Sequence, residues 1–246
     1  GILSIKLLRE FPKHYREGLF SPQDLVKLLV SHGAIAILKE DEYLMPALLP
    51  HLEPELVVQY RCHGAPLMIR FTQGYIPSGL FCHLVACLLS FSWQVCMERG
   101  KPLCLYRNCI RLEESGSSNI VTLIDMFSYV EVHVHEASSK VCREIRGVVT
   151  CGIKRACSAL KYHNVLLEDA FACRGARCSS DPPHLATVVK SGGPVFKWKC
   201  TVVGDQMENL SIDQLMWLLD CPLGAKVVSS PLISEYPFIE FPPPLS

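Results

Sequence analysis

The chain has 246 residues, enough for one large domain or two small ones with cores of their own. Its 24 basic and 24 acidic residues cancel, so the net charge gives no footprint for nucleic acid or for an anionic membrane surface. The mean hydropathy of +0.23 is high, but polar side chains interrupt the longest apolar run, residues 79–95. That run falls short of the roughly 20 apolar residues that span a bilayer, so we expect no membrane insertion.

The cysteine content favours a reducing compartment. Thirteen cysteines are spread through apolar helix and strand patterns, and their odd number would leave one unpaired in a disulfide scaffold. Buried thiols behave as small hydrophobic groups, and we expect a cytoplasmic location. The first six residues contain neither an initiator methionine nor a signal-peptide pattern, which indicates a piece of a longer protein.

The first predicted unit is a short helix followed by a hairpin. A capping-box-like start at Ser21–Asp24 precedes an apolar stripe, and the helix ends at Gly33. Residues 34–38 are predicted to form a strand, and residues 43–45 a returning strand that Pro46 stops. A helix and a small hairpin form the ending of a winged helix-turn-helix, although any helix–hairpin unit has the same pattern.

A linker and then a strand, turn and helix are predicted next. Residues 50–65 contain prolines, histidines and charges, which are typical of a linker or of a joint between subdomains. Residues 67–71 alternate in the way of a strand with one face in a core. Gly74 and Pro77 indicate a turn, and Ser78 is the expected N-cap of a helix with a buried stripe.

Three further strands are predicted at residues 103–112, 120–126 and 129–135. The last strand places Val130, Val132 and Val134 on one face and Glu131, His133 and His135 on the other. We expect the first face to be buried and the second to be wet, as in an antiparallel sheet. Two histidines on one face offer a geometry that a metal could use, but exposed histidines on a wet face are far commoner.

The overall pattern predicts an α+β fold. Residues 141–160 return to a helical period with one charged face, so the middle of the chain reads strand, helix, three strands, helix. From residue 173 the pattern is irregular, with a strand near 195–203 and a short helix capped by Ser211. We expect a winged-helix-like N-terminal unit, an antiparallel sheet with packed helices, and an irregular Cys-rich C-terminal part.

One group of residues has the chemistry of a metal site. Cys173, Cys178 and His184 follow one another in a turn-rich segment, and Cys200 comes sixteen residues later. Three thiolates and an imidazole are a ligand set for structural zinc. The spacing lacks the tight Cys-x-x-Cys knuckle, and Cys200 fits equally well as an inward residue of a strand.

No catalytic or nucleotide-binding motif is present. The sequence has no phosphate loop of the Gly-x4-Gly-Lys-Ser/Thr type, no Gly-x-Gly-x-x-Gly, no Gly-x-Ser-x-Gly and no His-Glu-x-x-His. We therefore expect this chain not to be an enzyme. Lys197, Trp198 and Lys199 place basic groups beside an aromatic ring, but an ordinary alternating strand has the same pattern, and nucleic-acid binding is not expected.

Several short motifs, in their order along the chain, resemble the COR domain, the region C-terminal to the Ras-like Roc GTPase in Roco proteins. The residues that carry the resemblance are Tyr43, Pro46, Phe71, Gly74, Pro77, Gly79, Phe81 and Trp93. The resemblance covers residues 1–135. A Roc phosphate loop is missing, and the residues after 170 lie outside it.

This resemblance implies a domain division and a function. Residues 1–55 would form the winged-helix-like first half, residues 66–165 the α+β second half that contributes to dimerisation, and residues 166–246 a Cys-containing extension. The function implied is that of a non-catalytic intracellular signalling scaffold that binds protein partners or itself, without a cofactor. A zinc-stabilised domain that contacts nucleic acid through the winged helix is the alternative.

Overall fold

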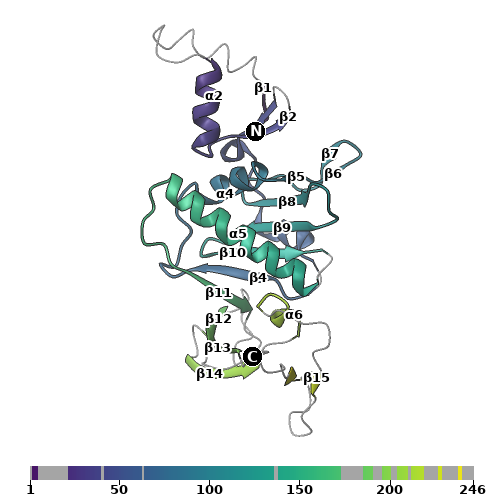
Figure 1. Cartoon of the computed structure of the whole chain (residues 1–246), viewed down its shortest axis with the longest axis vertical. Helices are drawn as coiled ribbons and strands as arrows, with labels where there is room; N and C mark the ends of the chain where they lie inside the picture. Colours follow the sequence, from purple (N-terminus) through teal and green to yellow (C-terminus); the bar gives the residue numbers. More distant parts are fainter. Residues whose placement is uncertain are drawn as a thin grey trace, which may run out of the picture.

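A nine-stranded antiparallel sheet forms the centre of the molecule (Figure 1). The structure is a computed structural model, and it describes residues 2–4, 22–39, 42–62, 64–135, 138–172, 185–190, 196–200, 204–209, 212–218, 227–228 and 238–239. The combination of this sheet with packed helices confirms the predicted α+β class.

The strand order of the central sheet is β14-β13-β12-β11-β4-β10-β9-β8-β5. The strands are β4 (Leu67–Phe71), β5 (Trp93–Val95), β8 (Cys109–Glu114), β9 (Ile120–Asp125), β10 (Tyr129–Val134), β11 (Leu167–Ala172), β12 (Leu185–Lys190), β13 (Phe196–Cys200) and β14 (Gly204–Asn209). The register pairs Val130 of β10 with Ile69 of β4 and with Asp125 of β9. The sheet therefore continues without a break from the predicted middle strands past residue 166.

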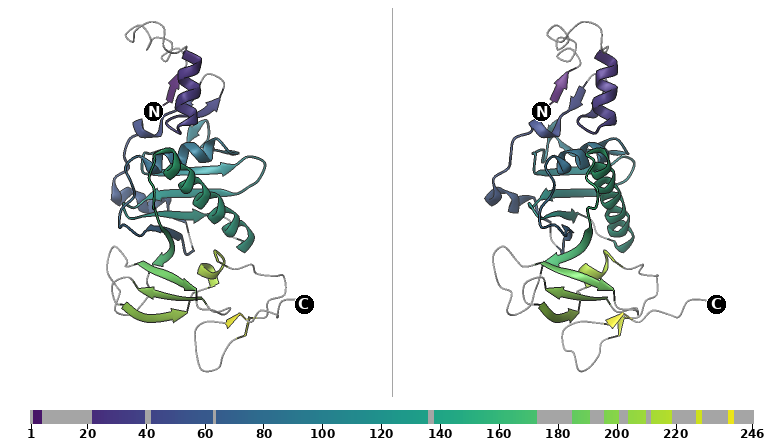
Figure 2. Two further views of the ribbon diagram at one scale, coloured as in Figure 1. Left: turned by 60° about the vertical axis from the view of Figure 1, so that its left-hand side comes forward. Right: turned by 90° about the vertical axis from the view of Figure 1, so that its left-hand side faces the viewer.

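Two helices cover one face of this sheet (Figures 1 and 2). They are α4 (Leu80–Leu89) and α5 (Ser139–Ala159), and α5 begins where the Ser138 side chain accepts a hydrogen bond from the Val141 N–H. Their apolar stripes enclose the main core with the inward side chains of β4, β5, β8, β9 and β10. Burial of these stripes supplies most of the helices' stability, since helices in proteins are stabilised mainly by packing of their apolar face.

The other face of the sheet is covered by the segment that the sequence predicts to be a linker. This segment contains the short helices α3 (Pro54–Val57) and η3 (Val58–Tyr60), which lie on the side of the sheet opposite α5 (Figure 2, right). The short helix η2 (Pro46–Leu48) precedes the segment and lies beside α4. Leu52 and Val57 are buried against Cys104, Cys109 and Ile124. The linker prediction is wrong, because these apolar side chains close a second core.

The N-terminal unit is one helix beside a small sheet. Helix α2 (Pro22–Ser31) ends before Gly33, which has a left-handed φ of 67°. Strands β2 (Ala36–Lys39) and β3 (Glu42–Leu44) form the predicted hairpin, and β1 (Ile2–Ser4) pairs with β3. The predicted helix and hairpin are confirmed, and the winged-helix assignment stays a prediction.

The remaining elements are short. The hairpin of β6 (Met97–Glu98) and β7 (Lys101–Pro102) projects from the β5 edge of the sheet (Figure 1). Helix α6 (Ile212–Leu215) is followed by Trp217, whose indole N–H donates a 2.9 Å hydrogen bond to the Ala65 carbonyl. Strands β15 (Val227–Val228) and β16 (Phe238–Ile239) pair with each other. Within the described residues, no helix is both long and apolar enough to cross a membrane.

Two local predictions differ from the structure. Gly79, with a left-handed φ of 77°, is the N-cap of α4, so the expected cap at Ser78 is wrong. The face of β10 that the sequence predicts to be wet is largely buried, with Glu131 and His133 only 2% and 3% exposed. Its cover is the 50–62 segment, which is distant in the sequence, so the alternation in β10 gave no sign of it.

Candidate interaction site beside the Pro77 turn

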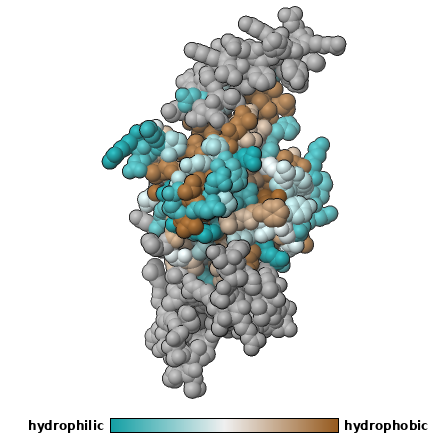
Figure 3. All heavy atoms as spheres, turned by 180° about the vertical axis from the view of Figure 1, so that it is seen from behind, coloured by the Kyte–Doolittle hydropathy of each residue, from teal (hydrophilic) through white to brown (hydrophobic). Residues whose placement is uncertain are grey.

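A cleft of about 630 Å³ opens between the 47–61 segment and the turn that precedes α4. Its lining comes from the 47–61 segment, the turn and first residues of α4, and the chain around β8 and β9: Ala47, His51, Pro54, Val57, Arg61, Ile76, Pro77, Ser78, Gly79, Phe81, Cys82, Arg107, Asn108, Asp125, Met126 and Phe127. On the face of the molecule that carries the 46–60 segment, hydrophobic side chains reach the surface between polar ones (Figure 3). The cleft is therefore mostly apolar with a few charged groups.

The turn at one wall of the cleft is fixed by its backbone. Gly74, with a φ of 84°, donates its N–H to the Phe71 carbonyl, and Leu80 donates to the Pro77 carbonyl. Glycine reaches this left-handed region without the steric cost of a Cβ atom. The Tyr162 hydroxyl, from the loop after α5, donates to the Ser78 carbonyl at 3.2 Å. The turn is thus held from both sides.

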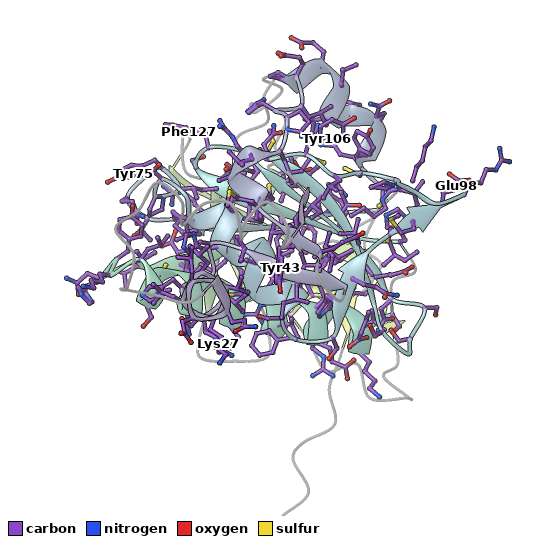
Figure 4. All side chains as sticks on the ribbon, turned by 90° about the horizontal axis from the view of Figure 1, so that it is seen from above. Lys27, Tyr43, Tyr75, Glu98, Tyr106 and Phe127 are labelled. Atoms are coloured by element: carbon purple, nitrogen blue, oxygen red, sulfur yellow. The ribbon has the colours of Figure 1, made fainter. Side chains whose placement is uncertain are left out.

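Phe127 stands at the rim of the cleft with 75% of its surface exposed. Its φ is 66°, a region that costs an ordinary L-residue roughly 1–2 kcal/mol. The Asp125 carboxylate accepts the Phe127 N–H at 2.9 Å, and the Ile76 N–H donates to the Phe127 carbonyl. Phe127 and the exposed Tyr75 lie at the same edge of the molecule, far from Glu98 at the tip of the β6–β7 hairpin (Figure 4).

The charged groups of the cleft act on one another. Burial raises the pKa of Asp125, while the hydrogen bond from Phe127 and the charges of His51 and Arg107 act in the opposite direction. Burial also raises the pKa of the Cys82 thiol, which keeps it protonated at neutral pH. The cleft accordingly presents a half-buried carboxyl group close to the exposed Arg107.

A polar cluster pins the 50–62 segment to the second face of the sheet. The His133 Nδ1 accepts the Cys62 N–H at 3.2 Å, and its Nε2 lies 2.9 Å from the Glu131 Oε1. Because Nδ1 accepts, we assign the proton to Nε2, which donates to Glu131. The other Glu131 oxygen accepts from the Arg61 guanidinium at 2.9 Å. Burial opposes ionisation of Glu131, but these two partners outweigh it and lower its pKa.

The same cluster extends to the neighbouring strands. Arg111 donates to the Thr122 hydroxyl at 3.1 Å and to the Tyr60 carbonyl at 3.3 Å. The Thr122 Oγ1 lies 3.2 Å from the His135 Nε2. Burial, Arg111 and His133 lower the pKa of His135, so this imidazole is neutral at pH 7.

This geometry indicates a structural role for Cys62 and His133. It does not suit a catalytic pair in which Cys62 is the nucleophile and His133 the base. Both ring nitrogens of His133 are already hydrogen-bonded, so neither is left to accept a proton from a thiol. Burial raises the pKa of Cys62, although Arg111 acts against it. A catalytic cysteine needs a lowered pKa.

The predicted zinc ligands lie outside the part of the chain that the structure describes. Cys173, Cys178 and His184 fall in the gaps of the described ranges, and Cys200 is described only as the last backbone position of β13. Among the described residues, no group of three or more His, Cys, Asp or Glu side chains could hold a metal ion.

The residues that carry the COR resemblance are distributed over the cleft and two cores. Pro77, Gly79 and Phe81 line the cleft, and Gly74 begins the same turn. Phe71 and Trp93 belong to the main core, Tyr43 to the core of the N-terminal unit, and Pro46 begins η2. The turn motif therefore meets the surface at the candidate site.

Sequence reasoning missed Phe127, Arg107 and Asp125. A signal for Phe127 was present, because a phenylalanine stood at a turn position that Gly, Asn or Asp usually occupies. Comparison of the chain with protein-family models found no match, and neither did comparison with curated protein sequences.

Proposed function

We propose that the chain is a non-catalytic, COR-like dimerisation module of a larger cytoplasmic signalling protein, and that two copies associate through the cleft beside the Pro77 turn. The observation that carries the proposal is Phe127, an aromatic ring held exposed beside a mostly apolar cleft. Exposed aromatic anchors next to desolvated pockets are the usual centres of binding energy in protein interfaces.

The strained backbone conformation at Phe127 supports a binding role for its aromatic ring. Asparagine or glycine would occupy the left-handed conformation at lower cost. Hydrogen bonds to Asp125 and Ile76 hold the Phe127 backbone in this strained conformation. Strained residues that a structure over-determines cluster at binding and active sites.

The position of the ring favours a second copy of the chain as the partner. An interface with two-fold symmetry needs a surface patch that is complementary to itself. A projecting ring next to a cleft meets this condition, because each copy can place its Phe127 in the cleft of the other. The Asp125 carboxyl group and the Arg107 guanidinium, which both line the cleft, can then approach the oppositely charged groups of the other copy.

Sedimentation velocity across low to high micromolar concentrations tests the proposal. We expect the mass of the wild-type chain to rise from 27.5 kDa towards twice that value. The Phe127→Asn variant should stay monomeric at concentrations where the wild type is dimeric. A wild-type chain that remains monomeric at high micromolar concentration would contradict self-association, and a dimeric Phe127→Asn variant would contradict this site.

A matched control separates the site from a general loss of apolar surface. Met97 is exposed in the β6–β7 hairpin, so Met97→Asn should dimerise like the wild type. The free energy of unfolding of Phe127→Asn should equal that of the wild type or exceed it by up to about 1 kcal/mol, since asparagine tolerates a left-handed φ. A lower value would mean that the ring packs within its own chain.

A further inference from the structure

A second surface lies on the helical face of the molecule, between α5 and β11. It is a groove of about 620 Å³. Its lining residues on α5 are Arg143, Arg146, Gly147, Thr150, Cys151 and Lys154, and facing them are Ile69, Val165, Leu166, Leu167 and Asp169. Figure 1 shows α5 lying across β10 and β4, with β11 beyond it, so this groove is separate from the Pro77 cleft.

The charge of this groove departs from the balance of the whole chain. Helix α5 carries five basic residues and one acidic residue, a net charge of +4, whereas the whole chain carries 24 of each sign. Arg143, Arg146 and Lys154 line the groove with the single carboxylate Asp169, which leaves a net charge of +2. Asp169 receives hydrogen bonds from the Arg146 Nε at 3.1 Å and from its Nη2, so each of its carboxylate oxygens is paired with Arg146.

The wall of the groove opposite α5 is apolar, and no side chain fills the middle of the groove on the α5 side. Leu166 is 66% exposed beside the half-buried Val165 and Leu167. On the helix side Gly147 has no side chain, and no atom lies within 4 Å of the place that a Cβ atom would take. A ligand can therefore lie between the cationic ends of the groove and touch an apolar wall.

We infer that this groove binds an acidic, extended polypeptide segment that also carries apolar side chains. Arg143 and Lys154 are eleven residues apart on α5, so they are separated by about 16 Å along the helix. An extended chain rises about 3.3 Å per residue, so carboxylates about four or six residues apart lie on one side of it and reach both cations. Leucine-like side chains between them meet Leu166.

Nucleic acid is the less favoured ligand. The groove has a modest net charge, and its described lining contains no aromatic side chain on which a base could stack. Strand β11 is hydrogen-bonded on both sides, to β4 and β12, so the segment binds through side chains and does not extend the sheet.

Fluorescence anisotropy of the whole chain with a labelled probe tests the inference. The probe is the peptide Gly-Ser-Glu-Leu-Ser-Leu-Glu-Ser-Gly, whose glutamates are four residues apart, at low ionic strength because exposed charges are screened by salt. We expect binding of this probe and none of a peptide with lysines in place of the glutamates. Lys154→Glu should weaken binding at least about tenfold, since it replaces an attraction with a repulsion.

The control is Lys101→Glu, an equal change of charge at an exposed position of the β6–β7 hairpin. It should bind the acidic probe like the wild type. Absence of binding at about 1 mM probe, or equal binding by Lys154→Glu and the wild type, would overturn the inference. Equal binding of a ten-residue oligothymidylate that Lys154→Glu also abolishes would assign the groove to nucleic acid instead.

Discussion

Gly152 of α5 lies so close to Leu84 of α4 that a Cβ atom on the glycine would come within 2.8 Å of the Leu84 Cδ1. Leu84 is fully buried and Gly152 is buried with it, so the Leu84 side chain has no room to withdraw. The two helices that cover the sheet therefore meet at a contact that admits no side chain on α5.

Gly152→Val should lower the free energy of unfolding by about 1–3 kcal/mol, the usual cost of overpacking a core. The measurement is urea unfolding at equilibrium, followed by circular dichroism. Gly147→Val is the matched control on the same helix, because open space surrounds Gly147 and helix propensity changes equally at both positions. Equal stability of the two variants would contradict the prediction, because α4 and α5 would then move apart at Gly152 without a cost in stability.

Asn108→Ala should be strongly destabilising. The Asn108 side chain accepts the Leu52 N–H at 2.8 Å and donates to the Leu52 carbonyl at 2.9 Å, both in buried surroundings. Its removal leaves two buried backbone groups without partners, at a cost of about 2–4 kcal/mol. The same change at the half-buried Asn119, in the β8–β9 turn, should cost less than about 1 kcal/mol in the same unfolding measurement. Similar losses for both variants would contradict a special contribution of the two Asn108–Leu52 hydrogen bonds to stability.

The stability of the chain should fall as the pH is lowered, in two steps. The pKa of His135 is lowered from 6.5, so its contribution is present above pH 6.5 and is lost as the pH falls through its folded-state pKa. The pKa of Glu131 is lowered from 4.5, so its contribution is lost in the same way below pH 4.5. Asp125 acts with the opposite sign, because its pKa is raised from 3.8 and its contribution is lost as the pH rises.

Urea midpoints measured from pH 8 down to about pH 2 should show both steps, the His135 step below pH 6.5 and the Glu131 step below pH 4.5. Glu131→Gln should be less stable than the wild type at pH 7, because it leaves the Arg61 charge without its carboxylate. Its decline below pH 4.5 should be shallower. A decline as steep as that of the wild type would exclude Glu131 as the titrating group.

Alkylation should distinguish the cysteines by burial. Cys151 is exposed on α5 and should react first with iodoacetamide at neutral pH. Cys104 and Cys109 are buried with their Sγ atoms 3.3 Å apart, and this mutual contact and burial raise the pKa of Cys109. Burial also raises the pKa of Cys96 to about 11. Peptide mass spectrometry over time measures each site, and urea should remove the differences; early labelling of Cys109 would contradict its burial.

The elements of the middle of the chain could be predicted because their signals are local. Alternation places β4 and β10, the helical period places α5, and the turns at Gly116 and Phe127 separate the strands. The cap of α4 could not be predicted in the same way. Ser78 has the better capping side chain, but the chain enters the helix through a left-handed residue, which favours Gly79.

The candidate site was less accessible to sequence reasoning because it joins residues that are distant in the chain. Arg61 and Glu131 are 70 positions apart, and no period in either segment predicts their ion pair. Local polarity suggested a linker at residues 50–65, whereas the fold uses the few apolar side chains of that segment to cover the sheet. The exposure of Phe127 depends on the tertiary contacts of Asp125 and Ile76.

The cover formed by residues 50–62 has a practical consequence for dissecting the chain. A fragment that begins at residue 66, where the linker prediction would place a boundary, loses Arg61 and Leu52. It would expose Glu131 and His133 to water without their hydrogen-bond partners Arg61 and Cys62. Trimming should instead leave the stretch from Pro46 attached to the sheet. The shortest piece that keeps both faces of the central strands closed starts ahead of that stretch, not after it.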